Sequence, residues 1–367
     1  MTVVHPSGAA DHKPSTTGHS WLLSVRLLTA VLLCLCFASV HIMNSNMGMA
    51  IVCMVNSTVH NSTAENSYHG TLDWSPEVQG YIFSAFNVGL LFMLATGWFA
   101  DKLNAKYILT ASVLLATAAN IIIPLGSVNS FAFAILGRVL VGFADALLQP
   151  TVNSLLTRWF PPNERSYALG LATGGRQLGT LLILPTAGLL CAQTEFLGGW
   201  PSIFYVSSMT GAVFVAIWLV FGADKPSKHW LISKGEVEFI AVSNALEQMD
   251  DKRKHRKVPW ARLLTSAPVW ASVVSLVCHE FPLITMIMFL PSYLKDVLKY
   301  ESSKNGFISA LPTACLWLSK LGSSYLNTWL QTHTSWKRTT IVKVLNSIGS
   351  LGLGCFLFAA TFLDESW

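Results

Sequence analysis

Residues 137–166 read GRVLVGFADALLQPTVNSLLTRWFPPNERS, and they carry the strongest indication of the architecture. It places two ionisable residues, Arg138 and Asp145, inside an apolar helix that ends at Pro161-Pro162. An ionised side chain at membrane depth costs a few kcal/mol. Because their spacing is about two helical turns, the two side chains fall on one face, roughly 10 Å apart. They could bracket one anion in a transport pathway; a buried structural pair that only orients helices is the alternative.

The composition is that of a membrane protein. Of the 367 residues, 52% are hydrophobic and 12% charged, and the mean hydropathy is +0.49. We therefore predict an all-α, polytopic membrane protein that contacts the lipid bilayer. The 7 cysteines lie in apolar segments, which indicates buried small hydrophobic residues and neither a disulfide framework nor a metal site: Cys34, Cys36, Cys53, Cys191, Cys278, Cys315 and Cys355.

Nine apolar stretches predict membrane-spanning helices. One is the stretch quoted above, and the others are residues 21–55, 77–100, 107–125, 167–192, 202–221, 268–297, 306–329 and 339–362. A short turn at residues 126–130 precedes the quoted helix. In the first span, His41, Asn44, Ser45 and Asn46 are expected to face a protein interior.

These spans divide the chain into four parts. Residues 1–20 predict a disordered cytoplasmic tail, and residues 21–221 a complete six-helix transmembrane half. Residues 222–267 predict a cytoplasmic central loop, and residues 268–367 a second half with three helices. Because this second half stops at its third helix, we expect a truncated chain.

Loop charges predict the topology. Asn56 and Asn61 begin two glycosylation sequons in a loop without Lys or Arg, which predicts a glycoprotein with this loop outside the cytosol. The central loop carries the basic run KRKHRK at residues 252–257 and is expected in the cytosol. A nucleic-acid-binding segment is the alternative for this run, but a solvated loop between two membrane halves fits it better. We expect no nucleic-acid partner.

Further motifs occur in the order of a known transporter family. They are NMGMAIV at 46–52, WSPEVQG at 74–80, the Gly-x-x-x-Asp loop in GWFADKLNAK at 97–106, QLG at 177–179, VPW at 258–260 and NGFISALP at 305–312. Together with residues 137–166 they resemble the anion:cation symporter family of the major facilitator superfamily, which includes sialin, the vesicular glutamate transporters and the sodium-phosphate cotransporters. The resemblance implies two related helical halves around a site at the membrane midplane.

The resemblance also implies roles for single residues. Arg138 matches an essential fourth-helix arginine, and Asp145 a glutamate implicated in coupling. His279 falls where relatives have a substrate-facing arginine or tyrosine, and it could be a pH-dependent cation or a neutral packed residue. Asn44 replaces a family arginine, whereas Arg176 is an additional one. We expect Arg176 to face the cavity near Asp145 and to supply the cation missing at Asn44.

The remaining site predictions concern coupling and gating. Gln177, beside Arg176, is expected to contact substrate, and Glu280 to take part in ion coupling. Asp101, Arg158 and Arg165 are expected to be cytoplasmic latches whose pairing changes during transport; charges that only set the topology are the alternative. Departures from the family pattern at Cys53, Phe83 and Val141 weaken the likeness to carriers of glutamate or sialic acid.

These patterns predict a secondary active transporter of small organic or inorganic anions that works by alternating access. Coupling to H⁺ or Na⁺ is expected, with no other cofactor; protonation of Asp145 would free Arg138 for the anion. The alternative is a truncated, non-transporting membrane protein that is inactive or regulatory. An enzyme is not expected, because the sequence has no metal-ligand spacing, nucleophile elbow or phosphate loop. The plasma membrane and endolysosomal or vesicular membranes remain open, and no oligomeric state is predicted.

Overall fold

The computed structural model describes residues 24–55, 71–93, 95–97, 103–193, 199–252, 262, 264–336 and 338–360. Several predicted features fall outside these residues: the sequons at Asn56 and Asn61, the latch candidate Asp101, the N-terminal tail and most of the basic run at 252–257. They stay predictions.

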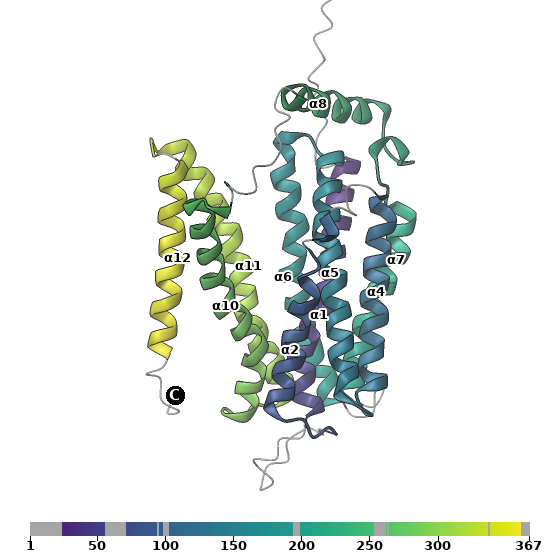
Figure 1. Cartoon of the computed structure of the whole chain (residues 1–367), viewed down its shortest axis with the longest axis vertical. Helices are drawn as coiled ribbons and strands as arrows, with labels where there is room; N and C mark the ends of the chain where they lie inside the picture. The colour runs from purple at the N-terminus through teal and green to yellow at the C-terminus, as the bar shows by residue number, and fades with distance from the viewer. Residues whose placement is uncertain are drawn as a thin grey trace, which may run out of the picture.

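The described elements are helical, as predicted (Figure 1). In chain order they are α1 (Val25–Met54), α2 (Pro76–Leu90), α4 (Ala105–Gly126), α5 (Phe131–Trp159), α6 (Pro162–Ala192), α7 (Pro201–Phe221), the 3₁₀ turn η2 (Pro226–Lys228), α8 (Lys234–Lys252), α10 (Ala267–Asp296), α11 (Ser302–His333) and α12 (Arg338–Ala360). Each predicted span corresponds to one of these helices, and the predicted turn at 126–130 separates α4 from α5.

Capping residues explain where α5 and α6 begin and end. The Ser130 side chain accepts a hydrogen bond from an amide in the first turn of α5, and α5 ends at Trp159, just before the two prolines. Pro162 occupies the first turn of α6 and Glu164 complements its dipole. For this reason α6 begins earlier than the predicted residue 167.

A turn interrupts the predicted second span: residues 93 and 95–97 are helical again, but α2 itself ends at Leu90. Beyond it the Leu91 amide contacts three preceding carbonyl groups, so the backbone tightens into a turn. Just before this turn α2 crosses α5 at close range. A Cβ atom added to Gly89 would lie 2.2 Å from a carbonyl oxygen of α5, and one on Gly142 would lie 2.0 Å from a carbonyl oxygen of α2.

Six helices, α1, α2 and α4–α7, form one bundle, here called the first bundle. The central helix α1 packs on α6 and α7, while α5 packs on α2 and α4. Two glycines of α6 allow close approach, since Cβ atoms on Gly175 and Gly179 would lie 2.0 and 2.4 Å from carbonyl oxygens of α1. Asn44, Ser45 and Asn46 are buried in this bundle, as predicted.

Five of the described helices are each long and apolar enough to cross a membrane: α1, α4, α5, α7 and α10. Of the other predicted spans, α2 has a short described length, and α6 and α11 carry more polar residues. Polar residues on α6 contact α1 and α5, for example Thr180 with Ser45 and Arg176 with Asp145. Such contacts inside the bundle satisfy groups that lipid could not.

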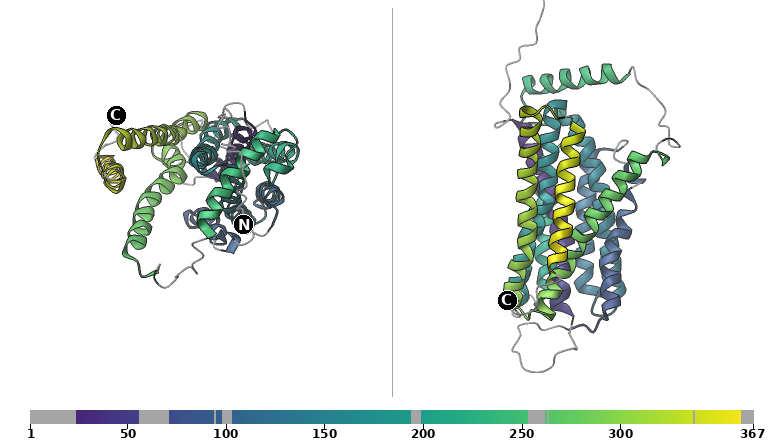
Figure 2. Two further views of the ribbon diagram at one scale, coloured as in Figure 1. Left: turned by 90° about the horizontal axis from the view of Figure 1, so that it is seen from above. Right: turned by 90° about the vertical axis from the view of Figure 1, so that its left-hand side faces the viewer.

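Three helices, α10, α11 and α12, stand beside the first bundle and form the α10–α12 group. Seen from above, the group curves away from the bundle, with α12 farthest out (Figure 2). It meets the bundle where α10 packs on α1 and where α11 packs on α6. At the second contact Gly188 of α6 and Gly306 of α11 touch backbone to backbone.

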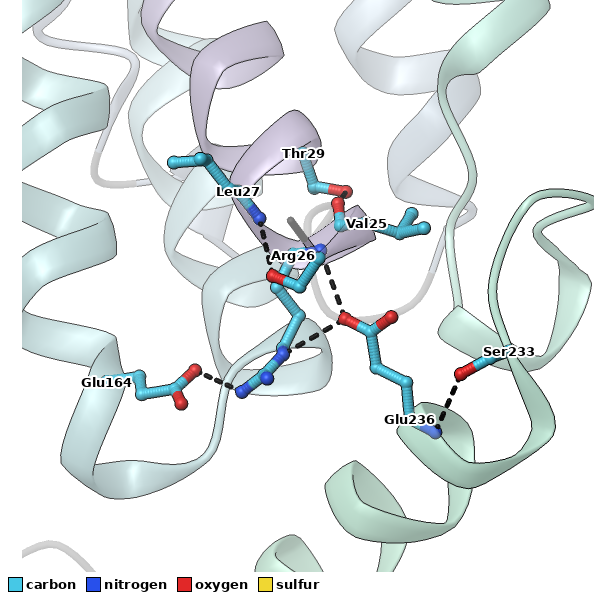
Figure 3. Close-up of polar contacts among 8 residues, drawn as sticks. Val25, Arg26, Leu27, Thr29, Glu164, Ser233 and Glu236 are labelled. Carbon is cyan, nitrogen blue, oxygen red and sulfur yellow. Dashed lines mark hydrogen bonds and ion pairs between the residues drawn. The ribbon is translucent and has the colours of Figure 1, made fainter. Parts of the chain in front are cut away.

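The helix α8 lies across one end of the first bundle, here called the α8 end (Figure 1). The predicted central loop therefore contains a long amphipathic helix, which the polar composition alone did not reveal. The buried Arg26 holds α8 in place, as Figure 3 shows. Its guanidinium donates to Glu164 of α6 and, at 3.0 Å, to Glu236 of α8, and it stacks over the Phe239 ring.

The prediction for the cysteines was wrong in part. Cys53 and Cys191 form a disulfide that joins the C-terminal ends of α1 and α6. These ends are far apart in sequence and meet only because the two helices pack side by side, which no local pattern reveals. Cys34 and Cys36 are buried as predicted, but Cys278, Cys315 and Cys355 are exposed on the α10–α12 group. Apolar faces without a protein neighbour are expected where a membrane helix meets lipid.

Candidate functional site

A cavity of about 710 Å³ lies between the first bundle and the α10–α12 group. It is lined from α1, α2, α5 and α6 on one side and from α10 and α11 on the other. Its walls are mostly apolar, with a few charged side chains, which is the usual character of a small-molecule site. All predicted substrate-binding and coupling residues line this cavity: Arg138, His279, Arg176, Asn44, Gln177, Asp145 and Glu280.

Arg138 is buried, with 1% of its surface exposed. Its Nη1 donates to the carbonyl oxygen of Asn44 at 2.8 Å, and its guanidinium lies 5.1 Å from the centre of the Phe86 ring. The Nε and Nη2 atoms have no hydrogen-bond partner among the residues that the structure describes. These two atoms form the edge of a guanidinium that binds a carboxylate or phosphate in bidentate fashion. Leaving two buried N–H donors without an acceptor costs free energy, so this edge of Arg138 fits an anion-binding site.

Asp145 is equally buried, but its contacts are to other residues. Its Oδ1 lies 3.4 Å from Nη2 of Arg176, and its Oδ2 lies 3.8 Å from Nε2 of His41. Arg176 lines the cavity beside Asp145, where the sequence placed it. Within the described part of the chain, Asp145 does not contact Arg138. The expected mechanism, in which protonation of Asp145 frees Arg138, is therefore not supported by a direct contact between these two side chains.

Arg176 is fixed on three sides. Its Nη2 donates to Oε1 of Gln149 at 2.8 Å and lies beside Asp145, and its guanidinium stacks over the Phe37 ring with 4.8 Å to the centroid. About a quarter of its side chain is exposed, namely 28%. With Asp145 as its counter-ion, Arg176 adds less net positive charge to the cavity than Arg138 does.

The predicted site residues from the α10–α12 group are less buried than Arg138 and Asp145. His279 is exposed and Glu280 half-buried, and both face the cavity from α10. Further along α10, the ring of Phe289 meets that of Phe83 of α2 edge to face at 5.1 Å, and both line the cavity. Gln177 lines the cavity from α6. The geometry brings these residues to one site and leaves their roles as proposals.

The two described latch candidates make contacts within the first bundle. Arg158 donates to Oδ1 of Asp224 at 2.5 Å, and the same oxygen accepts from the amide of Ala105 at the start of α4. Arg165 donates to the Thr157 carbonyl at 3.5 Å and lies near the end of α5. The contacts described here for Arg158 and Arg165 lie within the first bundle and do not distinguish the latch role from the topological role.

Sequence reasoning missed three parts of the site. His41 was placed in the interior but was not assigned to Asp145, and Gln149 and Phe86 were not singled out. Their signals were weak, because one helix pattern does not say how a neighbouring helix is rotated. A metal was not predicted, and the described residues include no group of three or more His, Cys, Asp or Glu suited to one.

Comparisons with known proteins agree with this architecture. A family model described as Major Facilitator Superfamily matches residues 33–367. The solved structure of a bacterial homologue of the human lysosomal transporter Spinster has a TM-score of 0.56 at 16% identity, covering 85% of this chain and 65% of that chain. At this identity the likeness concerns the fold alone.

Curated relatives are more similar in sequence. The probable small intestine urate exporter of Mus musculus is 32% identical over 354 residues, which covers 89% of this chain and 70% of the relative. Sialin of Homo sapiens is 28% identical over 361 residues, which covers 93% and 70%. Over the relatives that match first, the chain spans 66% to 70% of their length. These matches establish that the chain is a multi-pass membrane protein of the major facilitator superfamily, in the branch that contains sialin and the vesicular glutamate transporters.

Proposed function

We propose that the protein is a secondary active transporter of small anions, organic or inorganic, coupled to H⁺ or Na⁺ through alternating access. The observation that carries the proposal is the buried Arg138, whose Nε and Nη2 are directed at no partner among the described residues and which lines the cavity. A fixed cation is needed there, because an anion entering a low-dielectric cavity loses its hydration.

The names of the relatives support an anionic substrate. They include a urate exporter, sialin, a vesicular glutamate transporter and a Drosophila melanogaster protein with the provisional name of inorganic phosphate cotransporter. The position of the cavity between two groups of helices suits alternating access, in which one group rocks against the other around a central site. No cofactor besides the coupled ion is proposed.

Orientation and location belong to the same proposal. The α8 end faces the cytosol because the central loop is basic, and the N-terminus lies on that side. The loop with Asn56 and Asn61 then lies outside the cytosol, where both sequons are glycosylation sites. The protein resides in the plasma membrane or in an endolysosomal or vesicular membrane.

Uptake into liposomes tests the proposal. The full-length protein is reconstituted, and uptake of labelled phosphate, urate and glutamate is measured with an imposed H⁺ or Na⁺ gradient. At least one anion should accumulate above the level in empty liposomes. Uptake at the empty-liposome level for every anion under both gradients would refute the proposal.

Arg138→Lys is the sharpest variant for this assay. Lysine keeps the charge but replaces the planar fork with a point charge, so bidentate binding is lost. We expect the KM of the transported anion to rise about ten-fold or more, the size of one lost charge-assisted hydrogen bond. Lys343→Gln, on α12 away from the cavity, is the matched control and should leave KM unchanged.

A further inference from the structure

His41 of α1 and Asp145 of α5 face one another in the cavity wall. The imidazole Nε2 and the carboxylate Oδ2 are 3.8 Å apart, which is beyond hydrogen-bond distance, and their side chains are 14% and 2% exposed. The other carboxylate oxygen, Oδ1, lies 3.4 Å from Arg176 of α6. The carboxylate is therefore placed between two basic groups that come from different helices.

The charged and titratable residues near His41 and Asp145 determine the net charge of this part of the cavity. Arg176 is the nearest cation, and Gln149 and the Phe37 ring hold it in place. From α10, His279 and Glu280 line the same cavity. Arg138 makes its contacts elsewhere, with Asn44 and Phe86. When Asp145 is ionised and His41 is neutral, the charges of Arg176 and Asp145 cancel. One additional proton then gives the three residues His41, Asp145 and Arg176 a net charge of +1.

Resting on the proposed transport function, we propose that His41 and Asp145 together bind the coupled proton, at a site separate from the anion contact at Arg138. The proton adds to a lone pair of Nε2 or Oδ2 from one aqueous compartment and later leaves to the other, and no other bond changes. In either protonated form the two atoms share a hydrogen bond, so their separation shortens to about 2.7–3.0 Å. Histidine is suited to this role because its charge changes near neutral pH.

The proposed site also explains how proton and anion binding are linked. A proton on the pair adds positive charge to a cavity whose remaining unpartnered cation is Arg138, as far as the described residues go. The added charge favours entry of an anion, and a bound anion favours retention of the proton, since such coupling is reciprocal. The anion contacts Arg138, whereas the proton stays on α1 and α5.

The first test separates coupling from binding. In liposomes containing the full-length protein, exchange of labelled anion at equal pH measures binding and conformational change, and accumulation under a pH gradient measures coupling. His41→Gln keeps a polar side chain but cannot carry a proton. It should lower gradient-driven accumulation about ten-fold or more and lower exchange by a smaller factor, because the anion contact at Arg138 is kept. His333→Gln, at the exposed end of α11, is the matched control and should change neither.

The outcomes are distinguishable from those that test the function. If the unaltered protein moves anions with no response to a pH gradient, this inference fails and the proposed function stands. If His41→Gln lowers exchange and gradient-driven accumulation equally, His41 has a structural or substrate-binding role and the inference fails. If no anion is moved at all, the proposed function fails, and the measurement below decides the inference about the pair.

A spectroscopic measurement needs no transport. In protein labelled with ¹⁵N at histidine side chains, the His41 signal is identified by its loss in His41→Gln. Its pH titration should shift in Asp145→Asn, because the amide removes the shared proton site. A His41 titration that is identical with and without the Asp145 carboxylate would overturn the inference.

Discussion

Lys295, in the last turn of α10, donates from Nζ to the carbonyl oxygen of Val52 at 2.6 Å. Val52 lies in the last turn of α1, where carbonyl groups lack helical partners and carry the negative end of the helix dipole. The contact joins the α10–α12 group to the first bundle at the end opposite α8. It therefore helps to hold the two helix groups together at that end.

Loss of this contact should weaken the link between the two helix groups at this end. Lys295→Met removes a charged hydrogen bond worth about 1.5–3 kcal/mol, so opening at this end should become roughly ten-fold or more favourable. Hydrogen exchange of the amides in the last turns of α1 and α10, followed by mass spectrometry, measures this. Lys299→Met removes a charge from the same exposed segment and should leave exchange unchanged. Equal exchange rates in both variants would contradict the assigned role of Lys295.

At the other end of α1, Arg26 should be essential for docking of α8. Arg26→Ala leaves Glu164 and Glu236 facing one another without their shared cation, at a cost of roughly 3 kcal/mol. We expect a lower Tm in detergent and faster hydrogen exchange in α8. Arg26→Lys keeps the charge but not the fork that reaches both carboxylates, so its Tm should lie between those of the other two proteins. An unchanged Tm in Arg26→Ala would show that α8 is held by other contacts.

The disulfide makes a separate prediction. Cys53 and Cys191 close a sequence separation of 138 residues, and crosslinks over long loops typically contribute about 2–4 kcal/mol. The double variant Cys53→Ser/Cys191→Ser should have a lower Tm than the unaltered protein, and a reducing agent should lower the Tm only of the unaltered protein. The pair Cys278→Ser/Cys315→Ser, which removes two free cysteines, is the control and should retain the response to reduction.

Much of this fold is encoded in local patterns. Apolar runs of about 20 residues and the prolines at 161 and 162 were enough to locate the predicted spans and the end of α5, although not the polar helix α8. The spacing of Arg138 and Asp145 correctly put both on the cavity side of α5. These features depend only on the period of one helix, so they can be read from one segment at a time.

Contacts between helices were harder to predict, because they depend on how each helix is rotated and shifted against its neighbour. The sequence does not indicate that Asp145 meets His41 and Arg176 and leaves Arg138 without a carboxylate. The same limitation explains the missed disulfide between Cys53 and Cys191. In each case the partners are distant in sequence and become neighbours only through packing of whole helices.

The contact between Gly188 of α6 and Gly306 of α11 gives the last prediction. A Cβ atom on Gly306 would lie 2.5 Å from the Leu184 carbonyl oxygen and 3.0 Å from the Cα of Gly188. Backbone atoms cannot move aside as a flexible side chain can, so Gly306→Ala must push α11 away from α6. Overpacking of this kind costs about 1–3 kcal/mol, against a gain of about 1 kcal/mol in helix propensity.

The expected net effect of Gly306→Ala is a lower Tm. Gly322→Ala, on the same helix, is the matched control, because its Cβ would have no neighbour within 4 Å. With only the gain in helix propensity, its Tm should stay the same or rise. Opposite signs for the same substitution would show that close backbone contact, and not glycine flexibility, holds α11 to the first bundle. A Tm that is equal or higher in both variants would mean that α6 and α11 can move apart at this contact without a loss of stability.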